Sequence, residues 1–104
     1  MYGLHGSLKT VPGQREVLLG HLLQGADQLR DFEGCYLYVI SLDPTDEDKL
    51  WVTEVWRSQD DHRASLELQA IKDIITAARP ILAGMPDSME LLPQGGKGLP
   101  LNMA

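Results

Sequence analysis

The chain has 104 residues, of which 43% are hydrophobic and 23% are charged. This composition is typical of one small globular domain and argues against a disordered protein. The net charge of -6 at pH 7 lacks the positive field with which proteins bind phosphate backbones or anionic lipid. We therefore expect neither nucleic acid nor a membrane as a partner.

The single cysteine, Cys35, excludes an intramolecular disulfide framework, and the N-terminus has no basic segment followed by an apolar run. No uncharged apolar stretch approaches the roughly 18 residues of a membrane span. We therefore expect the protein in a reducing cytoplasm. A chain of this length buries only about 65% of the surface that its unfolded form exposes, so its core is thin and a partner subunit would help.

The first predicted elements are a strand and an amphipathic helix. Residues 2–9 alternate, with Tyr2, Leu4 and Leu8 on one face, which is typical of a strand with one face in the core. After a Pro-Gly break, apolar residues recur at spacings of three and four. This periodicity predicts a helix over about 13–31.

Two strands joined by an acidic loop follow. Residues 35–42 are apolar or aromatic on both parities, which predicts a strand covered on both faces. We expect the acidic loop 43–48 to be a solvated hairpin connection rather than a metal site, because no glycine follows at the calcium-loop spacing. Residues 49–57 alternate again, so Glu54 and Trp56 share one face.

The longest apolar stripe of the chain runs from Ala64 to Leu82 in steps of four and three residues. This stripe predicts one second helix. Ser58 is expected to cap its N-terminus, followed by acidic residues at the positive end of the helix dipole. Pro80 is expected to kink or end the helix, because proline lacks an amide donor and clashes with the preceding turn.

The C-terminal part is predicted to hold one more strand and a tail. Residues 85–92 follow a Pro-Asp break and predict a weaker last strand. Residues 93–104 hold three of the ten glycines and predict an extended or flexible arm. We therefore expect a folded domain over 1–92 and a tail over 93–104.

The predicted order is strand, helix, strand, strand, helix, strand. Because crossovers are right-handed, this order predicts a ferredoxin-like α+β sandwich with a four-stranded antiparallel sheet and both helices on one face. The apolar side chains of residues 35–42 then need a second cover, and a second copy of the sheet is the cover that we expect. The sequence thus predicts a homodimer.

The candidate chemistry lies around the third predicted strand, since nucleotide-loop, zinc and serine-hydrolase motifs are absent from the sequence. If Glu54 faces the helices, desolvation would raise the pKa of its carboxyl towards that of a general base. The alternative is a structural role, in which Glu54 pairs with an arginine or caps a hydrogen-bond network. Trp56 offers a flat wall for an aromatic ligand, and His62 could aim its imidazole into the gap between sheet and helices.

Further candidates for the site are His5 on the first strand and Arg79 before Pro80. Four of the six aromatic residues lie on the two neighbouring strands: Tyr36, Tyr38, Trp51 and Trp56. A cavity with such walls suits a planar, largely apolar ligand better than a sugar or a nucleotide phosphate.

The segment from Thr53 to Leu66, TEVWRSQDDHRASL, resembles the antibiotic biosynthesis monooxygenase domain family. It is similar to that family's E-x-W strand end, which is followed by a polar turn and a helix with an early histidine. The stretch from Ile71 to Met85 is similar to members described as quinol monooxygenases. The resemblance covers about residues 1–92.

This resemblance implies a dimeric ferredoxin-like barrel that oxygenates phenolic, quinol or anthrone-like substrates with O₂ and with no metal or flavin cofactor. A deprotonated phenol can itself reduce O₂, so the protein need only take a proton, hold the ring and stabilise the developing anion. Glu54 or His62 would accept the proton, Trp56 would hold the ring, and Arg79 would stabilise the anion. A non-catalytic dimeric binding or stress-response domain remains the alternative, with Glu54 and His62 as structural residues.

Overall fold

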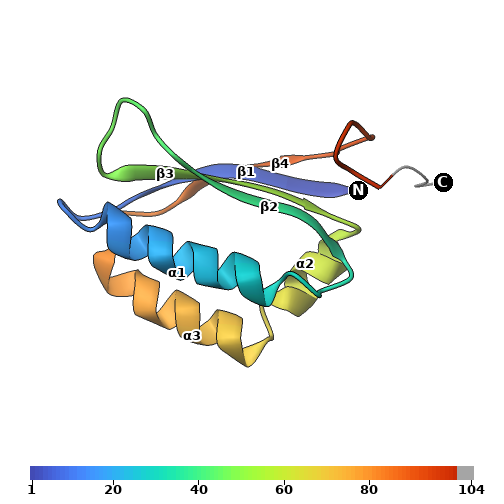
Figure 1. Ribbon diagram of the computed structural model, residues 1–104, viewed down its shortest axis with the longest axis horizontal. Helices are drawn as coiled ribbons and strands as arrows, with labels where there is room; N and C mark the ends of the chain where they lie inside the picture. The colour runs from blue at the N-terminus through green and yellow to red at the C-terminus, as the bar shows by residue number, and fades with distance from the viewer. Residues whose placement is uncertain (101–104) are drawn as a thin grey trace.

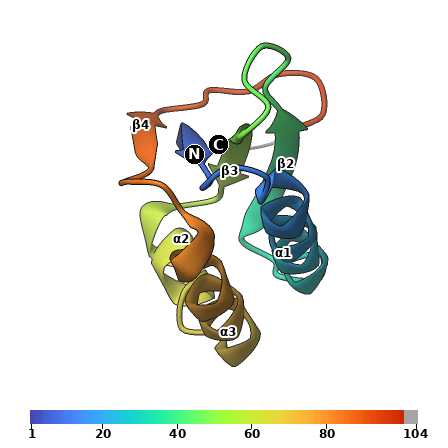
Figure 2. The same cartoon turned by 90° about the vertical axis from the view of Figure 1, so that its left-hand side faces the viewer.

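The computed structural model describes residues 1–100 and contains a four-stranded antiparallel sheet with its helices on one face (Figure 1). The strands are β1 (Tyr2–Lys9), β2 (Cys35–Leu42), β3 (Lys49–Trp56) and β4 (Asp87–Leu91), in the order β2-β3-β1-β4. The helices are α1 (Arg15–Gln28), α2 (Gln59–Ser65) and α3 (Gln69–Ala78), followed by a 3-10 turn over Arg79–Ile81. Figure 2 shows all three helices on the same side of the sheet, with α1 below β2. The predicted ferredoxin-like sandwich is confirmed.

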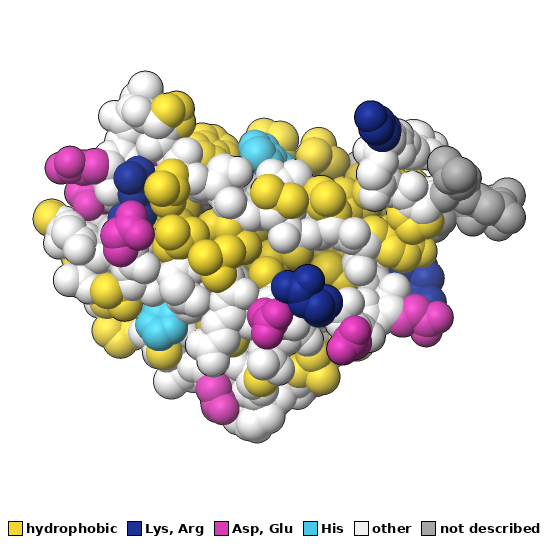
Figure 3. Space-filling model, viewed as in Figure 1, with side chains coloured by type: hydrophobic (Ala, Val, Ile, Leu, Met, Phe, Trp, Pro, Cys, Tyr) yellow, Lys and Arg dark blue, Asp and Glu magenta, His cyan; other side chains and the backbone are white. Residues whose placement is uncertain are grey.

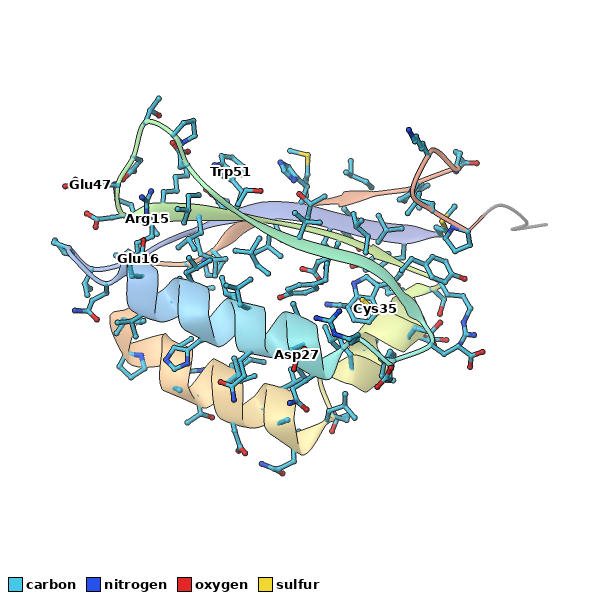
Figure 4. The ribbon with its side chains drawn as sticks, viewed as in Figure 1. Arg15, Glu16, Asp27, Cys35, Glu47 and Trp51 are labelled. Atoms are coloured by element: carbon cyan, nitrogen blue, oxygen red, sulfur yellow. The ribbon has the colours of Figure 1, made fainter. Side chains whose placement is uncertain are left out.

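The register between β1 and β3 decides which side chains face the helices. Tyr2 lies opposite Trp56, and Leu4 lies opposite Glu54. Because successive side chains of a strand point to opposite faces, Glu54 and Trp56 both face the helices. Trp51 has the other parity, and Figure 4 shows it on the side of the sheet away from the helices, which we call the outer face.

The apolar core between the sheet and the helices is divided into two clusters. The buried members of the first are Leu18, Leu50 and Ala78. The buried members of the second are Leu29, Trp56 and Ile71. Along β3, Val52 and Glu54 fall between Leu50 of the first cluster and Trp56 of the second. A carboxylate therefore occupies the middle of the layer between the sheet and the helices.

The prediction of one continuous second helix is wrong, because α2 and α3 are separate. Leu68 is extended, with φ of -66° and ψ of 130°, before α3 begins. The hydroxyl of Ser65 donates a hydrogen bond to the carbonyl of His62 at 2.6 Å and so competes with the helical ladder. The apolar stripe continues across the break, since Leu68 and Ile71 both pack into the second cluster. Periodicity alone cannot reveal such a break.

The strand β2 lies at the edge of the sheet, and one chain leaves its outer face open. Val39, which pairs with Thr53 on the outer face, is 44% exposed. The prediction that this strand is covered on both faces is thus not met within one chain. The acidic loop forms the hairpin to β3, as predicted, and Asp43 accepts a hydrogen bond from Trp51 Nε1 at 2.8 Å. This bond, with others from the loop, holds the pKa of Asp43 well below its usual value.

After β4 the chain turns back over the outer face near the N-terminus (Figure 1). A Cβ atom at Gly3 would lie 2.9 Å from Pro93 Cγ, so the first residue of the predicted tail packs directly on β1. The last four residues of the predicted tail, 101–104, lie outside the described residues. Within residues 1–100, no helix is long and apolar enough to cross a membrane.

Candidate active site

Glu54 is the centre of a polar group between β3 and the helices. Its side chain is 15% exposed, and its Oε1 accepts a hydrogen bond from Trp56 Nε1 at 3.1 Å. His62 Nε2 lies 3.8 Å from the same oxygen, which is longer than a hydrogen bond. An indole and an imidazole thus converge on one carboxylate oxygen.

Burial shifts the pKa values of these two groups in opposite directions. Burial raises the pKa of Glu54, and the hydrogen bond from Trp56 opposes this rise. Burial lowers the pKa of His62, and the charge of Arg63 adds to that effect. Both shifts disfavour the charged form. His62 is therefore a neutral imidazole at neutral pH, and its contact with Glu54 is not an ion pair.

His62 is positioned by the first turn of α2, where the predicted cap is confirmed. The hydroxyl of Ser58 accepts a hydrogen bond from the Asp61 backbone N–H at 3.1 Å. Arg57 donates two hydrogen bonds to the Asp61 carboxylate, each at 2.9 Å. The turn also packs closely on Gly34, where an added Cβ would lie 2.6 Å from Asp61 Cβ. Side chains outside the cavity therefore set the place of the imidazole.

The ring of His62 lies between two aromatic rings. Its centroid is 5.3 Å from that of Trp56 and 5.7 Å from that of Tyr2. The Tyr2 hydroxyl donates a hydrogen bond to Glu90 Oε2 at 2.8 Å. Sequence reasoning placed Tyr2 on the core face of its strand but missed it as a site residue. Its shared parity with Leu4 and Leu8 on the first predicted strand was the available signal.

Two cavities meet at Glu54. The first, about 140 Å³ in volume, is lined by Tyr38, Glu54, Trp56 and His62 and by aliphatic side chains of α1 and α3. The second, about 220 Å³, lies along β1 and reaches the exposed residues 86–88. The two cavities share the side chains of Leu22, Tyr38 and Glu54 as walls. The carboxylate is accessible from both.

Tyr38 contributes the free hydroxyl of the site, which has no hydrogen-bond partner among residues 1–100. Burial raises its pKa above the usual value, and the charge of Glu54 adds to the rise. The same two effects raise the pKa of the Cys35 thiol to about 11. Figure 4 shows Cys35 on the helix side of the sheet. Both groups therefore stay protonated at neutral pH, and the Tyr38 hydroxyl is available as a donor.

Gly25 and Ser65 are buried parts of the first cavity's wall that sequence reasoning missed. Gly25 lies three residues after Leu22 and four before Leu29, on the apolar stripe of α1. A glycine on that stripe leaves room next to the core, and this spacing was the available signal. A Cβ at Gly25 would lie 3.8 Å from Ile74 Cδ1, at ordinary contact distance.

Three of the predicted site residues lie away from Glu54, namely His5, Arg79 and Tyr36. His5 is on the outer face, where its ring stacks on Trp51 at 5.2 Å between centroids and its Nδ1 lies 3.0 Å from Thr53 Oγ1. Arg79 is exposed in the 3-10 turn after α3 and lines neither cavity at Glu54.

Tyr36 lies in the irregular step between Cys35 and Leu37, and it lines a separate groove on the α1 side of β2. The structure therefore brings together Tyr38, Glu54, Trp56 and His62 of the predicted set. Within residues 1–100, no group of three or more His, Cys, Asp and Glu side chains is arranged to hold a metal ion.

The family model described as antibiotic biosynthesis monooxygenase matches residues 1–77 of this chain. A protein of Chloroflexus aurantiacus J-10-fl, described as a candidate antibiotic biosynthesis monooxygenase, is 41% identical, with a TM-score of 0.87 over 95% of this chain and 98% of that one. A similarly described protein of Deinococcus radiodurans is 22% identical, with a TM-score of 0.79 over 92% of this chain and 95% of that one, and it shares the fold. A comparison with curated proteins finds no match. The chain belongs to the antibiotic biosynthesis monooxygenase family.

Proposed function

We propose that this protein is a cofactor-independent monooxygenase that oxidises a small hydroxylated aromatic substrate, such as a quinol, with O₂. One observation carries the proposal. A carboxyl and a neutral imidazole, 3.8 Å apart, meet at the wall of a cavity that is otherwise aromatic and aliphatic. A cavity at this point, rather than a gap filled by side chains, supports an enzyme over a purely structural domain.

The distance between Glu54 and His62 allows one substrate hydroxyl to form hydrogen bonds with both side chains. An oxygen atom can lie at about 2.8 Å, a hydrogen-bond distance, from both Oε1 and Nε2 when these are 3.8 Å apart. A phenolic hydroxyl held there transfers its proton to the ionised Glu54 or to His62. The resulting phenolate is the electron donor to O₂.

For a hydroquinone the overall reaction is balanced without another reductant. Hydroquinone and O₂ give hydroxyquinone and water, so the substrate supplies all four electrons that reduce O₂. One oxygen atom enters the ring, and the other leaves as water. The protein's part is to remove the proton and to orient the ring.

Tyr38 and Trp56 complete the proposed site. The free hydroxyl of Tyr38 donates a hydrogen bond to the negative charge that develops on the substrate, in an apolar setting where such a bond is strong. The ring of Trp56 forms a wall for the aromatic substrate. We assign the stabilisation of the anion to Tyr38 rather than to Arg79, because Arg79 is exposed outside the cavity.

We also propose that the protein works as a homodimer formed through the outer face of the sheet. The apolar side chains on this face include Val39, Met89 and Leu91, which are 44%, 57% and 45% exposed. Figure 3 shows hydrophobic side chains along the upper rim, where this face is seen edge-on. A sheet face with such side chains needs a cover, and the same face of a second copy supplies one. A clean monomer mass in light scattering at micromolar concentration would contradict the dimer.

The test is oxygen uptake with a panel of hydroquinones and anthrones, measured against heat-killed protein. We expect Glu54→Gln and His62→Ala to lower uptake by about 100-fold or more, the usual contribution of a general base. Glu16→Gln and His21→Ala are matched controls on α1, outside both cavities at Glu54. Full uptake in both site variants would refute the assignment of these residues.

A further inference from the structure

We infer that the site selects a substrate with a single hydroxylated ring that carries a short alkyl substituent next to its hydroxyl, rather than a fused-ring substrate. This inference rests on the proposed function for the identity of the reacting group. It narrows the substrate class from hydroxylated aromatic compounds in general to alkylphenols and alkylhydroquinones.

The first cavity has room for one ring. Its volume is about 140 Å³, and an apolar cavity of about 150 Å³ holds one benzene molecule. Its walls include Leu29, Trp56 and Ile71, which are 5%, 1% and 8% exposed and form the buried part of the second core cluster. Because close-packed walls yield little, a second fused ring would have to displace core side chains.

The polar groups of this cavity give the ring one orientation. Glu54, His62 and Tyr38 bring polar atoms to the sheet and α2 side, whereas α1 and α3 contribute aliphatic side chains such as Leu22 and Ile75. A ring that carries one hydroxyl therefore directs it towards Glu54 and places its hydrocarbon edge between the helices.

The second cavity begins where that hydroxyl lies. Leu22, Tyr38 and Glu54 border both cavities. A flexible chain attached next to the hydroxyl can pass these three side chains into the second cavity, where it meets Leu4 and Val52. A rigid tricycle such as anthrone cannot change its shape to pass between these three side chains. The second cavity thus accommodates an alkyl substituent and not a further fused ring.

Binding of four probes to the wild-type protein tests the inference: phenol, 2-propylphenol, 1-naphthol and anthrone. Calorimetry without O₂ keeps binding separate from turnover. We expect 2-propylphenol to bind more than about tenfold more tightly than phenol, as burial of two methylene groups would give. We expect 1-naphthol and anthrone to bind at least about tenfold more weakly than 2-propylphenol, because overpacking opposes them. Anthrone binding as tightly as 2-propylphenol, or no binding of 2-propylphenol at millimolar concentration, would overturn the inference.

Three variants locate the ring. Gly25→Ala adds a methyl group inside the first cavity and should weaken phenol binding about fivefold or more. Gly20→Ala changes the same helix where nothing lies within 4 Å, so its phenol affinity should equal that of the wild type. Ile74→Ala enlarges the first cavity and should improve the binding of 1-naphthol relative to phenol. Equal phenol affinities for Gly25→Ala and Gly20→Ala would place the ring elsewhere and refute the inference.

The two proposals can fail separately. If 2-propylphenol binds as expected but neither it nor alkylhydroquinones drive oxygen uptake, the monooxygenase function is wrong and the preference for one ring stands. If anthrone drives uptake and the one-ring compounds neither bind nor react, the preference is wrong and the monooxygenase function stands.

Discussion

Replacing Gly25 by alanine is expected to stabilise the protein more than replacing Gly20, although both glycines lie in α1. Neither glycine is among the residues of positive φ, so an alanine fits the backbone at both positions. A glycine inside a helix costs about 1 kcal/mol relative to alanine. Both substitutions therefore share a gain of about 1 kcal/mol in the free energy of unfolding.

The difference between the two comes from the cavity. The new Cβ at Gly25 would lie 3.8 Å from Ile74 Cδ1 and 4.0 Å from Ile71 Cδ1, whereas nothing lies within 4 Å of the new Cβ at Gly20. Burying one methyl group contributes about 0.8 kcal/mol more. Gly25→Ala should thus gain nearly 2 kcal/mol in total. Each kcal/mol shifts the Tm of a domain of this size by about 4–8 °C.

Thermal unfolding of the two variants and the wild type, followed by circular dichroism in one buffer without ligand, measures these gains. Urea unfolding at room temperature provides the corresponding free energies. A Gly25→Ala variant that unfolds at a lower temperature than Gly20→Ala would refute the reasoning. Such a result would mean that the space between Gly25 and Ile74 is already filled.

Three further predictions concern charge, packing and capping. Burial raises the pKa of Glu54 in the folded protein above its pKa in the unfolded chain. The folded protein therefore loses stability as the pH rises from the pKa of the unfolded state to that of the folded state. Glu54→Gln should thus be more stable than the wild type in urea unfolding at neutral pH, and it should lose this advantage in acid. Gly6→Ala places a Cβ 2.9 Å from Ser88 Cα, so β4 must shift, and we expect a loss of about 1–3 kcal/mol in thermal unfolding; an unchanged Tm would show that the edge strand yields freely. Ser58→Ala removes the cap of α2 and should cost about 1 kcal/mol, which Ser58→Asn should largely restore in the same melt.

The part of the site on β3 could be predicted because alternation is a local property of a strand. Two-residue periodicity alone placed Glu54 and Trp56 on one face and Trp51 on the other. The same rule separated His5 from Tyr2 on the first strand. Only the pairing of β1 with β3 showed that the face of His5 is the outer one.

The remaining parts depend on contacts between distant segments. The apolar stripe from Ala64 to Leu82 continues through the break after Ser65, so its spacing predicts one helix where there are two. Arg79 was expected to stabilise an anion on the basis of the family resemblance, but the 3-10 turn leaves it exposed beyond the end of α3. Gly25 forms part of the cavity wall because it lies opposite Ile74 of α3, a contact between two helices that sequence spacing does not reveal.

Because Gly34 packs closely against Asp61, the position of His62 depends on a contact outside the cavity, whereas the hydrocarbon surface of the cavity depends on its own wall residues. A Cβ at Gly34 would lie 2.6 Å from Asp61 Cβ, so the contact between this loop and the first turn of α2 must shift, whereas Leu29, Trp56 and the other walls of the cavity keep their sequence. A shift of the first turn of α2 would carry His62 with it, so the 3.8 Å separation of His62 Nε2 and Glu54 Oε1 can change while the hydrocarbon walls of the cavity stay the same. If the proposed function holds, a substitution at Gly34 would change the spacing of the two proton acceptors and leave the hydrocarbon walls of the cavity unchanged.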